Sequence, residues 1–334
     1  MYRIVSFGGP TLGPFAGSWL TERAGWRWNM RVLPMFSFVA LCLYAFTVPE
    51  THRPTLARKQ QRRWRKRLER SRDQEEDQDT AEKGSSVGVS GPKPPKEMPS
   101  ASLKQRLMTA LKLPFTYLVE EPLVMVVCLY TAILYGMLYG LLGAFPYAFI
   151  DIRGLTRLNT SWMYLSILLG FIIGAAFIGC LLQDRQFKRA WDNGTYTPES
   201  RIGPASWGSF AVPVGLFIFA WTAPFSEKVH WLGPCVGMAV FAFGMQLTFN
   251  SWLSYLGDAY GPNSASAMAA ATFSRSMLGA VFPLFMKDLL RAMTLQGAMS
   301  MFAGISIPLS VCGLLFVKYG SRIRAKSKHA VEPQ

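Results

Sequence analysis

Charged side chains are scarce in this sequence: Asp, Glu, Lys and Arg together make up 16% of its 334 residues. Soluble globular chains carry roughly a quarter of such residues. Half of the residues are hydrophobic, and 13% are aromatic. The shortage of charge argues against an ordinary soluble domain, because most of these side chains need a solvent other than water. It favours helices that cross a membrane.

Histidine and cysteine are also rare, and their positions argue against metal chemistry. The three histidines lie at or beyond the ends of apolar runs, at His52, His230 and His329. The cysteines fall inside apolar runs without C-x-x-C or Cys/His spacing, at Cys42, Cys128, Cys180, Cys235 and Cys312. Paired mid-span carboxylates and Ser/His or Cys/His arrangements are missing as well. We therefore expect no metal, no cofactor and no catalytic residue, and predict that the protein is not an enzyme.

Apolar runs are what the sequence has in abundance. A helix needs about 20 apolar residues to cross a hydrocarbon core of about 30 Å. Runs of that kind lie at 2–20, 28–48, 122–149, 161–182, 205–223, 231–255, 265–289 and 298–319. The sequence therefore predicts an all-α membrane protein with about eight transmembrane helices.

The apolar pattern breaks between residues 49 and 114. A basic run at 58–72 is followed by an acidic run at 73–82 and then by Gly, Ser and Pro. Such a composition has too few large apolar side chains to offset the entropy of ordering. We predict a mostly disordered linker over 49–114, between helical groups at 1–48 and 115–319, and a tail at 320–334.

The net charge of +15 is concentrated in alternate loops between the apolar runs. Membrane proteins keep such loops on the cytosolic side, so we expect an integral protein of the plasma membrane with a cytosolic C-terminus. For the basic run at 58–72, three interpretations stay open: a solvated cytosolic loop, a contact with anionic lipid, or a nuclear or nucleic-acid signal. The membrane setting favours the first two, and we expect no nucleic-acid partner.

Small residues recur every four positions in the first apolar run, at Gly9, Gly13 and Gly17. This spacing places them on one helix face, where another helix can approach closely. With Pro14 and Ser18 they form a stretch that resembles the G-x-x-x-G-P-x-x-G-G motif on the fifth helix of major facilitator antiporters, with Ser18 in place of the last glycine. Ordinary tight packing is the alternative interpretation.

A second motif follows the fourth run, where the loop LQDRQFKR keeps Asp184, Arg185, Lys188 and Arg189. It is similar to the G-x-L-a-D-r-x-G-r-[KR] loop of the same superfamily. An acid beside clustered cations can form a network in one conformation and lose it in another, which suits a gate. A positive-inside loop with one incidental acid is the alternative.

Further segments, among them VPETHRP, PESRIGPASWG and KYGSRIR, look like the fungal twelve-helix drug:proton antiporter branch of that superfamily. The resemblance implies a major facilitator bundle in which the eight runs correspond to helices five to twelve, with the N-terminal four helices missing. It also implies proton-coupled antiport of a small drug-like or polyamine-like molecule by alternating access.

The alternative is a truncated, non-transporting fragment or a half-transporter that needs a partner chain.

Polar residues at mid-span are the candidates for a substrate path. Arg275 lies midway along the seventh run, where a charge costs roughly 2.5 to 3.5 kcal/mol and should face a cavity or a partner. It is expected to hold an anionic substrate group or to pair with a carboxylate that exchanges a proton. A fixed interhelical hydrogen bond to backbone carbonyls is the alternative.

Two further groups complete the candidate path. Tyr135 and Tyr139 share a helix face and offer rings for stacking or cation–π contact, with packing as the alternative. Gln246, Asn250 and Tyr255 give the sixth run hydrogen-bonding capacity, with ordinary interhelical contacts as the alternative. None of the runs places Asp or Glu at mid-depth, so no proton carrier is predicted.

Overall fold

The computed structural model describes residues 2–47, 60–61, 103–178 and 201–325. Every regular element in these ranges is a helix, which confirms the all-α prediction. The chain divides into one unit of residues 1–29 with 104–334 and a second of residues 30–103. Each unit is described by itself.

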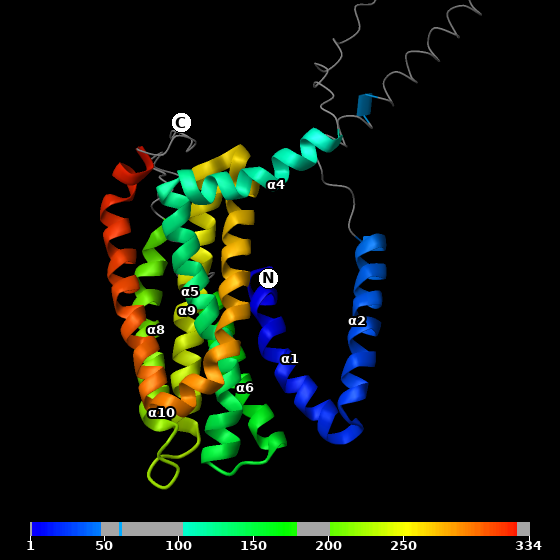
Figure 1. Cartoon of the computed structure of the whole chain (residues 1–334), viewed down its shortest axis with the longest axis vertical. Coiled ribbons are helices and arrows are strands. Elements are labelled where there is room, and N and C mark those ends of the chain that lie inside the picture. The colour runs from blue at the N-terminus through cyan, green and yellow to red at the C-terminus, as the bar shows by residue number, and fades with distance from the viewer. Residues whose placement is uncertain (1, 48–59, 62–102, 179–200, 326–334) are drawn as a thin grey trace, which may run out of the picture. The chain divides into compact units, whose positions relative to one another are not determined.

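The larger unit contains a bundle of long helices (Figure 1). Its elements are α1 (Tyr2–Ala24), α4 (Leu103–Glu120), α5 (Pro122–Pro146), the π-helix η1 (Tyr147–Ile152), α6 (Arg157–Phe177), α8 (Gly203–Thr222), α9 (Leu232–Tyr260), the short η4 (Gly261–Asn263) and α10 (Ser264–Ala325). The main helix pairs in contact are α8 with α9, α10 with α5 and α8, and α6 with α9 and α1. The candidate site lies where α5, α9 and α10 meet.

Helix α10 contains a sharp turn that divides it into two. Thr294 has φ 63° and ψ 166°, outside the helical region, and Figure 1 shows the parts before and after it running in opposite directions. The two parts match the runs expected at 265–289 and 298–319. The sequence signal for a break is weak, because no glycine or proline occupies position 294.

Six described helices are long and apolar enough to cross a membrane, against eight expected runs. Part of the difference is the 53-residue segment Ser264–Phe316, counted once although it holds two expected runs. The remaining one is the run at 2–20, which does form α1 but is not among the six. Its glycines, prolines and hydroxyl side chains dilute the apolar content of the helix.

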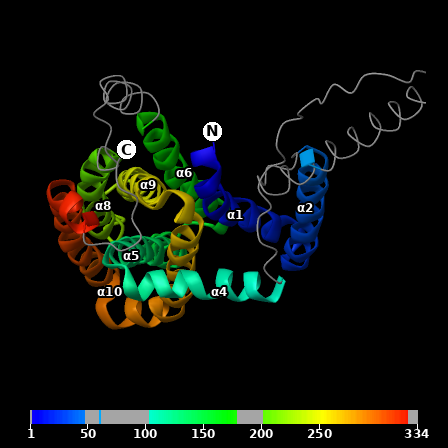
Figure 2. The same ribbon diagram turned by 90° about the horizontal axis from the view of Figure 1, so that it is seen from above.

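The end of the expected linker is helical, because α4 begins at Leu103. The apolar residues of α4 recur with a helical period, but the charged residues between them made this segment look like a continuation of the linker. Helix α4 is not among the candidate spans, and it lies across one end of the bundle (Figures 1 and 2). The ring of Phe115 packs on Phe273 at 5.0 Å, and that of Tyr117 packs on Tyr260 at 5.8 Å. Residues 48–59 and 62–102 lie outside the described part.

Reciprocal glycine contacts bring α8 and α9 unusually close. A Cβ added to Gly208 would lie 2.6 Å from the carbonyl oxygen of Gly244, and one added to Gly244 would lie 2.6 Å from that of Gly208. Gly215 and Gly237 repeat the arrangement seven residues along each helix. Without side chains between them, the two backbones touch directly, as is common for helices packed in membranes.

At the end of the bundle opposite α4, Arg153 holds the segment that follows α8. Its guanidinium donates hydrogen bonds to the carbonyls of Thr222 (2.7 Å), Ala223 (2.9 Å) and Val229 (3.1 Å). Burial lowers the pKa of Arg153. The carbonyls at the C-terminal end of α8 thereby gain a cationic donor.

Most of α2 (Trp26–Thr47) lies in the second unit, and its apolar side chains point in all directions around the helix. A helix that is apolar all round is typical of a membrane span.

Candidate functional site

Arg275 of α10 contacts two aromatic rings. Its guanidinium carbon lies 5.3 Å from the ring centroid of Tyr135 on α5 and 5.2 Å from that of Phe249 on α9. The two rings are stacked, with centroids 6.3 Å apart and planes at 26°. We call Arg275, Tyr135, Phe249 and Tyr139 the aromatic cluster. Side chains from three helices therefore build it, and α5 lies more than 80 residues before α9 in the chain.

The cluster lies deep in the bundle. At 1.5 Å per residue, Arg275 is about 17 Å along α10 from Ser264, close to the middle of a core of about 30 Å. Its side chain is half-buried. Within the described part of the chain, no ion pair or hydrogen bond involves this guanidinium, whose contacts are the two rings. Fixed hydrogen bonding to backbone carbonyls is therefore not what the structure shows.

Tyr139 extends the cluster along α5. Its hydroxyl oxygen lies 3.5 Å from that of Tyr135, and the ring centroids are 5.0 Å apart. Gly279 on α10 faces both rings, and a Cβ there would lie 3.0 Å from a ring carbon of Tyr135 and 3.4 Å from one of Tyr139. The sequence interpretation missed Phe249 and Gly279. Gly279 follows Arg275 by one helical turn, and that spacing was the available signal.

The polar residues expected on α9 do not join the cluster. Gln246 is fully buried and packs against Gly174 of α6. Asn250 donates a hydrogen bond of 2.9 Å to the backbone carbonyl of Gln246. Tyr255 is nine residues from Gln246, which at 3.6 residues per turn puts it about 180° around the helix. Its ring lies near those of Trp252 and Phe316.

The antiporter-like motif lies on α1, with Pro14 and Ser18 half-buried. A Cβ added to Gly9 or Gly13 would meet nothing within 4 Å, so these two glycines are not in a close helix contact within the described part of the chain. The carbonyl of Gly17 accepts a hydrogen bond from Asn29 (3.1 Å). Helix α1 meets α6 elsewhere, with the rings of Phe15 and Trp162 5.1 Å apart.

The gating-loop residues Asp184, Arg185, Lys188 and Arg189 lie outside the described residues, as does the basic run at 58–72 except for Gln60 and Gln61. Their expected roles stay predictions.

Two polar contacts fix the last turn of α9, and the sequence interpretation missed both. Tyr260 donates a 3.1 Å hydrogen bond to the carboxylate of Glu121, whose side chain is 1% exposed. Asp258 forms an ion pair with Arg201, just before α8. Burial, and then the charge of Glu121, raises the pKa of Tyr117. The Glu121–Pro122 pair indicates only where α5 begins, since proline favours the first position of a helix.

A family model describing the Major Facilitator Superfamily matches residues 1–283. The chain belongs to the Major Facilitator Superfamily. This confirms the family resemblance and the helical membrane fold, and the members of that superfamily are carriers and not enzymes. It also supports an integral membrane location in contact with the lipid bilayer. No solved structure matches the chain.

Fungal transporters are among the relatives of this superfamily member. "Efflux pump FUB11" of Gibberella fujikuroi is 34% identical over 334 residues, covering 99% of this chain and 54% of the relative. "Probable drug/proton antiporter YHK8" of Saccharomyces cerevisiae is 33% identical, covering 99% and 60%. "Major facilitator superfamily multidrug transporter FLU1" of Candida albicans is 32% identical, covering 99% and 51%. The chain thus spans about half the length of the curated relatives it matches.

Proposed function

We propose that the chain functions in the transport of a small organic molecule across the plasma membrane by proton-coupled antiport with alternating access. The aromatic cluster carries the proposal. A half-buried guanidinium in contact with two rings, near the middle of the expected span, carries an energetic cost that intramembrane charges usually bear for a functional reason. Carriers of this kind bind substrate near the bilayer midplane, between helical repeats.

In this proposal, the cluster contacts the substrate directly. The rings of Tyr135, Tyr139 and Phe249 stack on an aromatic or amphipathic body, and Arg275 holds an electron-rich or anionic group. A drug-like molecule fits this arrangement better than a polyamine. A polycation would meet the positive charge of Arg275, beside which no described side chain provides a carboxylate.

Proton coupling rests on the relative named as a drug/proton antiporter. In the proposed orientation the C-terminus and the basic linker face the cytosol, where the run at 58–72 contacts either water or anionic lipid. The loop with Asp184 is proposed as part of the gate on that side.

A flux assay tests the proposal. The purified chain is reconstituted into vesicles, and efflux of three aromatic dyes, one cationic, one neutral and one anionic, is followed with and without an imposed pH gradient. We expect gradient-dependent flux that Arg275→Ala lowers by about tenfold or more, because it removes the only cation of the cluster. Arg157→Ala, at an exposed position at the start of α6, is the matched control and should leave flux unchanged. Equal flux by the Arg275→Ala variant would remove the assigned role.

A further inference from the structure

Two rows of side chains with four-residue spacing lie along the contact between α5 and α10. The row on α5 and η1 holds Tyr135, Tyr139, Gly143, Tyr147 and Asp151, and the row on α10 holds Arg275, Gly279, Pro283, Lys287 and Arg291. At one end the rows meet in the aromatic cluster. At the other end, six of these residues line a single cavity.

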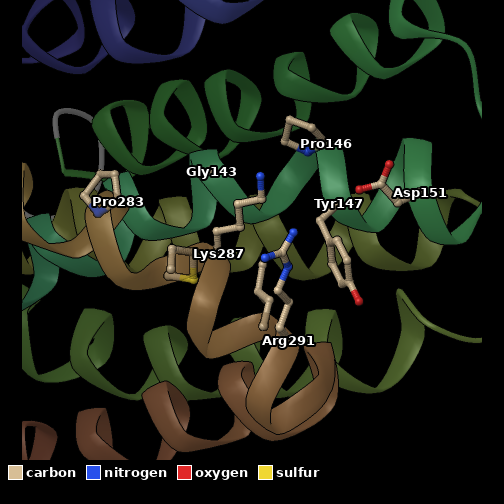
Figure 3. Close-up of a pocket in the computed structure, with 9 residues that line it drawn as sticks. Gly143, Pro146, Tyr147, Asp151, Pro283, Lys287 and Arg291 are labelled. Carbon is tan, nitrogen blue, oxygen red and sulfur yellow. The ribbon is translucent and has the colours of Figure 1, made fainter.

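The cavity has a volume of about 280 Å³ and lies between the end of α5, η1 and α10 (Figure 3). Ligand pockets in proteins usually hold about 300 to 1,000 Å³. The cavity therefore has room for a small molecule or for one end of a larger one. Its apolar wall is formed by Pro146, Met286 and Leu290.

The residues that line the cavity include two cations, Lys287 and Arg291, and one acid, Asp151. Lys287 and Arg291 are one turn apart on α10 and share a face. Figure 3 shows both side chains extending from α10 toward α5, with the ring of Tyr147 extending from η1 beside Arg291 and with Asp151 farther along η1. Neither cation forms an ion pair with any side chain in the described ranges. Two like charges at this spacing repel each other, and an anion between them would relieve the repulsion.

We propose that this cavity binds the oxyanion group of a small organic anion, in the simplest case a carboxylate, between Lys287 and Arg291. The apolar part of the ligand lies against Leu290 and Met286, and Tyr147 of η1 forms the wall of the cavity on that side. A lipid phosphate shares this chemistry, so the source of the oxyanion is decided by experiment. The site does not depend on transport by the chain, since it is defined by binding alone.

Calorimetry in nanodiscs tests the proposal on the full chain. In phosphatidylcholine discs, we expect benzoate to bind with an affinity that falls as salt rises, because the contact is electrostatic and partly exposed. Benzamide has a similar size and no charge, and it should bind far more weakly. Equal binding of the two probes overturns the proposal.

Three variants and one control locate the binding. Lys287→Gln and Arg291→Gln should each weaken benzoate binding by about tenfold, the usual effect of losing a hydrogen bond to a charged group. Asp151→Asn removes the one negative charge of the cavity and should strengthen binding. Lys228→Gln changes an exposed cation outside the cavity and should have no effect. Lys287 and Arg291 are exposed, so these variants keep the core packing, which size-exclusion profiles verify. Unchanged affinity in both cation variants overturns the proposal.

Phosphatidylglycerol in the discs separates the two sources of the oxyanion. If lipid occupies the cavity, benzoate binding to the wild type weakens in these discs, and purified wild type retains more phosphatidylglycerol than the Lys287→Gln/Arg291→Gln double variant. If a free carboxylate is the ligand, benzoate affinity is the same in both discs. No benzoate binding in phosphatidylcholine, together with equal lipid retention by wild type and double variant, overturns the proposal.

Discussion

Arg275 places a full positive charge inside an apolar bundle with rings in place of a counterion. A mid-membrane arginine costs roughly 2.5 to 3.5 kcal/mol on insertion scales, and a desolvated cation–π contact returns about 2 kcal/mol. The contacts with Tyr135 and Phe249 therefore offset much of this cost without neutralising the charge. The guanidinium stays able to bind an anionic or electron-rich group.

Glu121 supplies a residue-scale prediction about stability. Its carboxylate accepts the hydrogen bond of buried Tyr260, so Glu121→Ala removes a hydrogen bond from a buried hydroxyl, at a cost of about 1 to 3 kcal/mol. Glu120→Ala, at the exposed neighbouring position, should stay within about 0.5 kcal/mol of the wild type. Thermal unfolding is followed by a thiol-reactive dye, which reports exposure of the buried Cys128 and Cys235. Equal transition midpoints for the two variants would contradict the assigned contact.

A contact in the site could be predicted from the sequence only where its residues lie close together in the chain. Tyr135 and Tyr139 are one turn apart on a single helix, so their shared face followed from spacing alone. Arg275 stood out because charge is rare in an apolar run. Phe249 joins them only through the packing of α9 against α5 and α10, which no local pattern encodes. The same is true of the contact between Glu121 and Tyr260.

At the scale of helices, the contact between α8 and α9 depends on the absence of side chains. A Cβ on Gly215 would lie 2.3 Å from the backbone nitrogen of Phe241, and backbone cannot yield as the end of a flexible side chain can. Gly215→Ala should therefore destabilise the protein by about 1 to 3 kcal/mol, as other overpacked cores do.

Gly304→Ala is the matched control for that prediction. A Cβ on Gly304 meets nothing within 4 Å, and alanine is the better helix former by roughly 0.5 to 1 kcal/mol. The same dye assay should show a lowered midpoint for Gly215→Ala and an equal or raised midpoint for Gly304→Ala. Similar midpoints for the two variants would mean that α8 and α9 do not approach as closely as described.

Most helices were predictable from apolar length, because a run of about 20 apolar residues has few other stable arrangements. The bounds of α5, α8 and α9 differ from the expected runs by a few residues. Helix α4 was missed in part because its charged residues resemble those of the preceding linker. The turn at Thr294 had only a weak local signal, and it was predictable mainly because the combined length of two spans required a turn near this point.

At the scale of the whole molecule, the alternation of spans makes a prediction about sidedness. The segment after η1, the segment after α8 and the turn at Thr294 should share one side of the membrane, and the ends of α4 and α9 should lie on the other. Single cysteines at Arg157, Lys228, Thr294, Glu120 and Asn263, in a chain whose own cysteines are replaced by alanine, test this arrangement.

With a cytosolic C-terminus, a membrane-impermeant maleimide should label positions 157, 228 and 294 in intact cells. Positions 120 and 263 should be labelled only after permeabilisation. If the two sets of positions exchange their labelling, the predicted spans are correct but the protein has the opposite orientation, because inverting the protein moves every loop to the other side of the membrane. Labelling of 263 and 294 from the same side would mean that the first part of α10 does not cross the membrane. In that case the aromatic cluster would lose its place at mid-depth, since Arg275 lies between these two positions, and the proposed substrate path would fall with it.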